Sequence, residues 1–119
     1  MVFDGGVADI SRSRTITAPP QAIWDVLADF GSLSAWADDV DHSCILNQGP
    51  DGAATGTTRR VQVGRTVLVE RITEFDPTTA LAYRIEGLPS RLRTTVNRWT
   101  LRPVGNSTEV TVTSRVEIG

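Results

Sequence analysis

From Val40 onward, strand-like segments alternate with turn residues, and this pattern constrains the fold more than any other feature of the sequence. Six runs carry β-branched or aromatic residues at alternate positions, and each run is closed by Gly, Pro, Asn or Asp. Because the connections between them are short, consecutive strands are expected to pair antiparallel. An edge strand over 11–17 would add a seventh. The six predicted strands of this meander span 40–47, 57–63, 66–75, 80–86, 93–102 and 108–118.

Two short helices are predicted between the first strand and the meander. The first begins at a Pro-Pro pair, which suits the first turn of a helix, and is expected to end at Gly31. Ile23, Leu27 and Phe30 recur with helical spacing and form its buried face. A second helical segment is expected over 32–37. The predicted fold class is therefore α+β, with a curved seven-stranded antiparallel sheet.

Length and composition indicate one domain over residues 1–119. A hydrophobic content of 39% and a charged content of 22% are ordinary for a globular protein. Residues 1–10 are aperiodic and are predicted to form a loose leader without the features of a signal peptide. No apolar run reaches the roughly 20 residues needed to cross a bilayer. A cytoplasmic location without an integral membrane segment is therefore expected.

The charged and reactive side chains exclude several classes of function. A net charge of −2 argues against a nucleic-acid partner. All twelve basic residues are arginine, so no lysine can form a Schiff base. His42 and Cys44 are the single histidine and cysteine, too few for a disulfide, a catalytic triad or a zinc site. We therefore expect neither a metal nor a cofactor.

Four local sequences carry a resemblance to a known family. They are APPQAIWDVLADF at 18–30, VERITEFDP at 69–77, LAYR at 81–84 and WTLRP at 99–103. Together with the order of the predicted elements, they resemble the helix-grip superfamily called SRPBCC, or START-like, and within it the polyketide cyclase/dehydrase-like members. The resemblance covers about residues 11–118 and implies a sheet wrapped around a pocket for a small, largely apolar molecule of lipid or polyketide type.

The resemblance also implies a long C-terminal helix across the concave face of the sheet. That helix is absent from this chain, which reaches Gly119 directly after the last predicted strand. At about 25 cal/mol per Å² of apolar surface, covering that face is worth many kcal/mol. We therefore expect this face to be covered in one of two ways: by a second copy in a homodimer, or by a helix that a longer natural chain supplies.

Strand alternation selects candidate ligand contacts, because residues two apart point to the same face of a sheet. The faces that carry the most apolar residues are predicted to be concave. The resemblance implies that the Gly- and Pro-containing loop 87–92, which carries Leu88 and Leu92, lies at the mouth of the pocket and can move over a bound ligand, with Leu88 as a lid residue. The candidate ligand-binding residues are Arg59, Val61, Leu68, Glu70, Tyr83, Ile85, Leu88, Leu92, Thr95, Asn97 and Trp99.

Glu70 is the first candidate for chemistry because it alternates with apolar neighbours. It would either face the pocket, where burial would raise its pKa as a general acid requires, or pair with Arg59 or Arg84 at the sheet surface. Tyr83 is the second catalytic candidate, and Asn97 would bind a ligand or complete a network with Glu70. Arg59 is expected to be a solvated strand residue or the partner of a ligand carboxylate.

The predicted pocket and its candidate residues are compatible with three functions. The first is binding or carriage of a small apolar molecule, which requires no catalytic group. The second is a cofactor-independent polyketide cyclase or dehydratase with Glu70 as acid/base and Tyr83 or Asn97 orienting a carbonyl. The third is a protein-interaction module. A salt-bridged Glu70 would favour the carrier, whereas a carboxylate beside a second polar group in a closed pocket would favour the enzyme.

Overall fold

Seven strands form one antiparallel sheet in a computed structural model, which describes residues 6–87 and 92–118. Their order in the sheet is β1-β7-β6-β5-β4-β3-β2, so the meander is closed on one side by the N-terminal strand. The predicted α+β fold with an antiparallel sheet is confirmed. The strands are β1 (Gly6–Ile16), β2 (His42–Asn47), β3 (Thr58–Val63), β4 (Thr66–Asp76), β5 (Ala80–Glu86), β6 (Leu92–Val104) and β7 (Ser107–Ile118).

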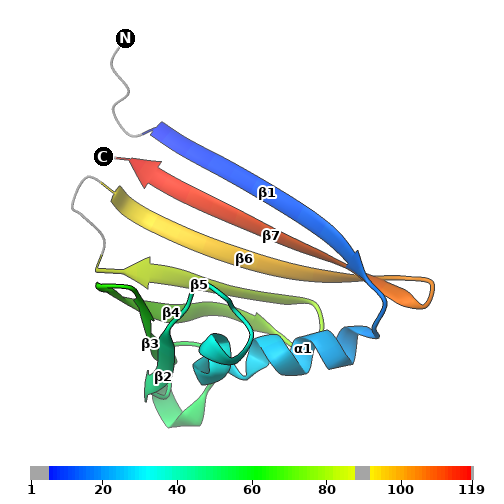
Figure 1. Cartoon of the computed structure of the whole chain (residues 1–119), viewed down its shortest axis with the longest axis horizontal. Coiled ribbons are helices and arrows are strands. Elements are labelled where there is room, and N and C mark those ends of the chain that lie inside the picture. The colour runs from blue at the N-terminus through cyan, green and yellow to red at the C-terminus, as the bar shows by residue number, and fades with distance from the viewer. Residues whose placement is uncertain (1–5, 88–91, 119) are drawn as a thin grey trace.

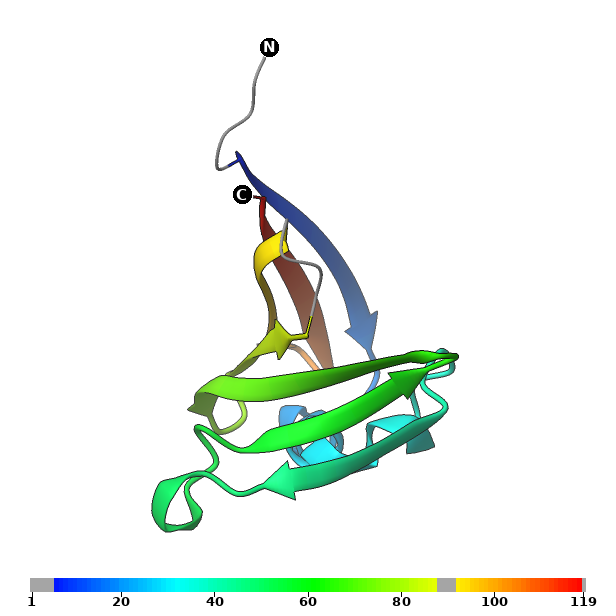
Figure 2. The same cartoon turned by 90° about the vertical axis from the view of Figure 1, so that its left-hand side faces the viewer.

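The sheet is strongly curved. Figure 1 shows the long strands β1, β7 and β6 running together on one side, with α1 close to their far end. Seen from the side, strands β2, β3 and β4 run at a steep angle to β1, β7 and β6 (Figure 2). This curvature gives the sheet a concave face, against which the helices pack.

The two predicted helices lie between β1 and β2, with shifted ends. Helix α1 spans Pro20–Ala28, and the 3₁₀ helix η1 spans Phe30–Ala35; a short 3₁₀ turn, η2, covers Pro50–Gly52. Gly31, predicted to end the first helix, instead lies inside η1. A Cβ atom there would lie 2.8 Å from Cγ1 of Ile45, so this glycine permits close approach of η1 to β2.

The prediction that residues 1–10 form a loose leader is partly wrong. Strand β1 begins at Gly6, so residues 6–10 belong to the sheet and pair with the last residues of β7. Asp9 lies opposite Arg115, and their side chains form an ion pair at 2.9 Å. The sequence analysis missed this part of the strand because its apolar residues show no regular alternation. Backbone hydrogen bonds hold an edge strand in the sheet, and they need no apolar pattern.

The register places the core on the concave face. Leu81, Trp99 and Val112 lie in one cross-strand row, and Tyr83, Asn97 and Ser114 lie in the next. Helix α1 packs against this face through Trp24 and Leu27. The buried core cluster consists of Trp24, Leu27, Phe30, Ile72, Leu81, Tyr83, Leu101 and Val110.

Candidate ligand-binding site

Arg59 and Glu70 form a buried ion pair on the concave face, where β3 and β4 place them directly opposite each other. Nε of Arg59 donates to Oε1 of Glu70 at 2.7 Å, and Nη2 lies 2.7 Å from the same oxygen. Only 4% of the Arg59 side chain and 7% of the Glu70 side chain are exposed. The expectation that Arg59 is solvated is therefore wrong. Glu70 has one of its two predicted partners, but at a buried position rather than at the sheet surface.

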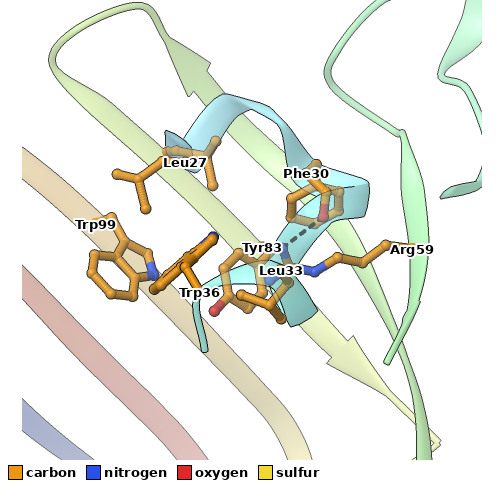
Figure 3. A pocket seen from close by; sticks show the side chains of 8 residues that line it. Leu27, Phe30, Leu33, Trp36, Arg59, Tyr83 and Trp99 are labelled. Atoms are coloured by element: carbon orange, nitrogen blue, oxygen red, sulfur yellow. Dashed lines mark hydrogen bonds between the residues drawn. The ribbon is translucent and has the colours of Figure 1, made fainter. Parts of the chain in front are cut away.

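The Arg59 guanidinium is held by more than its carboxylate. Nη1 donates to the carbonyl oxygen of Phe30 at 3.0 Å, and the guanidinium carbon lies 3.8 Å from the centre of the Phe30 ring and 4.6 Å from that of Tyr83. Figure 3 shows Arg59 reaching between these two aromatic residues. A planar guanidinium suits this combination of stacking and hydrogen bonding. Arg59 therefore ties β3 to the start of η1.

Burial raises the pKa of Glu70 above its ordinary value of 4.5, and the charge and hydrogen bond of Arg59 offset part of that effect. The half-buried carboxylates of Glu74 and Glu86 behave in the opposite way. Their hydrogen bonds to Arg98 and Arg71 lower the pKa of each carboxyl. Glu70 is thus distinguished from these surface carboxylates by its removal from water.

Tyr83, Asn97 and Ser114 form a second polar group in the adjoining row. Ser114 Oγ donates to Oδ1 of Asn97 at 2.6 Å, and Nδ2 of Asn97 lies 3.4 Å from the hydroxyl of Tyr83. The Glu70–Asn97 network, one of two alternatives predicted for Asn97, is wrong, because these two side chains share no hydrogen bond. Each residue has its own partners, and the contact of Arg59 with the Tyr83 ring connects the two sets.

The space at this polar centre is too small for an organic ligand. Its volume is about 10 Å³, which is the scale of one water molecule. Figure 3 shows the aromatic rings of Trp36 and Trp99 beside it, with Arg59 at its other end. Its lining residues are Leu27, Phe30, Leu33, Trp36, Arg59, Leu81, Tyr83 and Trp99.

A larger hollow borders the same two tryptophans. We call it the Trp99 groove; it has a volume of about 340 Å³ and an almost entirely apolar lining. Trp36 and Trp99 meet edge to face, with ring centres 6.1 Å apart, and both line the groove as well as the small cavity. The residues that line it are Ile16, Ala18, Ala22, Ile23, Val26, Leu27, Trp36, Trp99 and Val110.

A second hollow of about 390 Å³ adjoins the groove. The two hollows share Ile16, Trp99 and Val110. Arg12 and Arg14 line the second hollow on the β1 side. Together the hollows have the apolar walls and few polar groups typical of a small-molecule site.

The structure places the predicted contacts unevenly around these spaces. Trp99 lines both large hollows, whereas Val61 is buried and Leu68, Ile85 and Thr95 are half-buried on the same face. Leu88 lies outside the described residues, and so does the side chain of Leu92, whose backbone begins β6. The predictions for these two residues are not tested.

Residues of β1 and α1 were missed by the sequence analysis. Arg12, Arg14 and Ile16 alternate along β1 and face the same hollow, while Ile23 and Val26 supply the α1 side of the groove. The alternation was visible in the sequence. The pairing of β1 with β7, which sets these residues beside Val110 and Val112, was not.

Two features are absent from the described residues. Nowhere in residues 6–87 and 92–118 do three or more His, Cys, Asp or Glu side chains gather as metal ligands. None of the helices in the same part of the chain has the length and the apolar character that crossing a membrane requires.

Comparison with known proteins gives a family and a fold. The family model described as polyketide cyclase / dehydrase and lipid transport matches residues 7–119. No curated protein matches the chain in sequence.

Three solved structures show the same architecture. The Zhui aromatase/cyclase from Streptomyces sp. R1128 is 19% identical, with a TM-score of 0.78 over 93% of this chain and 68% of that chain. A START superfamily protein from Mycobacterium smegmatis is also 19% identical, with a TM-score of 0.76 over 93% and 77%. The protein Ara h 8.0201 is 17% identical, with a TM-score of 0.75 over 95% and 78%. At these identities the likeness concerns the fold alone.

Proposed function

The chain belongs to the polyketide cyclase / dehydrase and lipid transport family, and we propose that it binds or carries a small, largely apolar molecule in the Trp99 groove. The observation that carries this proposal is the groove itself. It is an apolar hollow of about 340 Å³ between α1 and strands β1, β6 and β7, continuous with the hollow beside it. Its size and lining are those of a small-molecule site.

The exposure of apolar side chains on the groove wall supports the same proposal. Trp36 is 41% exposed although it lies against Trp99, and Val26 of α1 is 47% exposed on the groove wall. Apolar side chains gathered in one hollow are unfavourable in water, and a bound apolar molecule would remove them from it. A ligand in this position would touch Trp99, one of the contacts proposed from sequence.

The ion pair of Glu70 supports binding rather than catalysis. A general acid or base must reach the proton that it transfers. Nε and Nη2 of Arg59 both lie 2.7 Å from one oxygen of Glu70, little of the Glu70 side chain is exposed, and the adjoining cavity has room for about one water molecule. Glu70 and Arg59 therefore act in this proposal as the support of the cavity wall rather than as ligand contacts.

A cyclase or dehydratase is the alternative, and the raised pKa of Glu70 is the observation that favours it. Such an enzyme would need the two tryptophans to separate, so that a substrate could reach Tyr83 and Glu70. Tyr83→Phe discriminates between the two functions. It would abolish turnover in an enzyme that uses this hydroxyl, whereas a carrier would retain its affinity for an apolar ligand.

Native mass spectrometry of the protein purified from its host tests the proposal. The expected result is a bound small molecule that is released on denaturation and extracts into organic solvent. Protein that carries no such molecule, and that also fails to bind an added apolar alcohol such as decanol, would contradict the proposal.

A further inference from the structure

Arg12 and Arg14 place two positive charges on an otherwise apolar part of the concave face. Their positions on β1 lie opposite Val112 and Val110 of β7, and alternation directs both toward the hollow that continues the Trp99 groove. Ser13 lies between them and also borders this hollow, and its hydroxyl is 2.8 Å from that of Thr111.

The other arginines near β1 and β7 have acidic partners. Arg115 pairs with Asp9 at 2.9 Å, and Arg102 pairs with Glu109 at 3.1 Å. Within residues 6–87 and 92–118, by contrast, no ion pair involves Arg12 or Arg14. Among the described groove residues these two arginines therefore offer a positive charge that the protein itself does not balance.

A guanidinium remains charged at every physiological pH and presents a planar set of donors that matches a carboxylate or phosphate. Two arginines separated by one residue on a strand can approach the same anionic group from one side. We propose that the ligand of the Trp99 groove is a free amphiphile whose anionic head, a carboxylate or phosphate, binds Arg12 and Arg14 while its apolar part lies along Trp99 and Val110. This inference rests on the proposed function and defines the chemical class of its ligand.

Decanoate and decanol, which have the same number of carbons and differ in charge, test the head-group assignment by calorimetry at neutral pH. The wild type is expected to bind decanoate more tightly than decanol. The double variant Arg12→Gln/Arg14→Gln should lower the affinity for decanoate about tenfold or more, because charge-assisted hydrogen bonds are lost, and leave the affinity for decanol unchanged. A control, Arg60→Gln/Arg65→Gln, removes the same charge elsewhere and should change neither affinity.

The possible results separate the two proposals. Equal binding of decanoate and decanol by the wild type, or an equal loss of decanoate affinity in both double variants, would overturn the head-group assignment and leave the groove as an apolar site. Failure of both compounds to bind would overturn the proposed function as well. Co-sedimentation with phosphatidylglycerol vesicles that depends on Arg12 and Arg14, without any binding of free decanoate, would overturn the assignment to a free amphiphile.

Discussion

Arg59 and Glu70 lie opposite each other on β3 and β4, and the arginine donates to one carboxylate oxygen at 2.7 Å in a setting that excludes most water. The same guanidinium contacts the ring and the carbonyl oxygen of Phe30. One pair of charges therefore links the centre of the sheet to η1. Since η1 leads directly to Trp36, the geometry of the groove wall depends on this pair.

Glu70→Gln is expected to destabilise the protein. Removing one partner of a buried ion pair leaves the other charge without compensation, and the usual loss is about 3–5 kcal/mol of unfolding free energy. Urea unfolding checks this value. The double variant Arg59→Met/Glu70→Leu, which buries no charge, should recover much of the loss. A single variant as stable as the wild type would identify Glu70 as a group that the fold does not need, as a pocket-facing functional acid would be.

Trp36→Ala is expected to weaken binding of an apolar probe without unfolding the protein. Trp36 is 41% exposed and contributes a wall of the groove, so its removal costs ligand contact more than core packing. Decanol calorimetry should show an affinity lowered by about tenfold. Val67→Ala serves as the control, because Val67 is 45% exposed and alternates with the concave residues of β4. Equal effects of the two variants would place the probe outside the groove.

A homodimer through the concave face stays a prediction. Ile10 and Ile16 are 61% and 38% exposed, and both lie on the same face of β1 as Arg12 and Arg14, which border the groove. Monomers seldom leave large apolar patches in water, so a second copy is expected to cover this surface. Sedimentation velocity at micromolar concentration should give the mass of a dimer. A monomer that retains affinity for decanol would show that the ligand alone covers the groove.

The fold could be predicted because its signals are local. The alternation along Thr66–Asp76 and the turn residues after each strand do not depend on distant parts of the chain. The predicted end of the first helix was wrong, because Gly31 is typical of a helix end but here lies inside η1, where it permits the close approach of Ile45 from β2.

The candidate site could be predicted only in part. Alternation correctly grouped Glu70 with Ile72, and Tyr83 with Leu81, but it does not tell whether a grouped polar residue meets water or another side chain. Arg59 is buried because η1 covers it, which is a tertiary effect. Arg12 and Ile16 became recognisable as groove residues only when β1 was placed beside β7.

Methyl NMR of the protein titrated with decanol tests the central claim most directly, because methyl groups report on one face of the sheet at a time. Saturable shifts are expected for Ile16, Val110 and Val112, which line the hollows of the concave face. The methyl groups of Val67 and Val69, which alternate with the concave residues of β4, should not move. Shifts that fail to saturate, or that are as large at Val67 and Val69 as at Val110, would contradict a ligand site in the Trp99 groove.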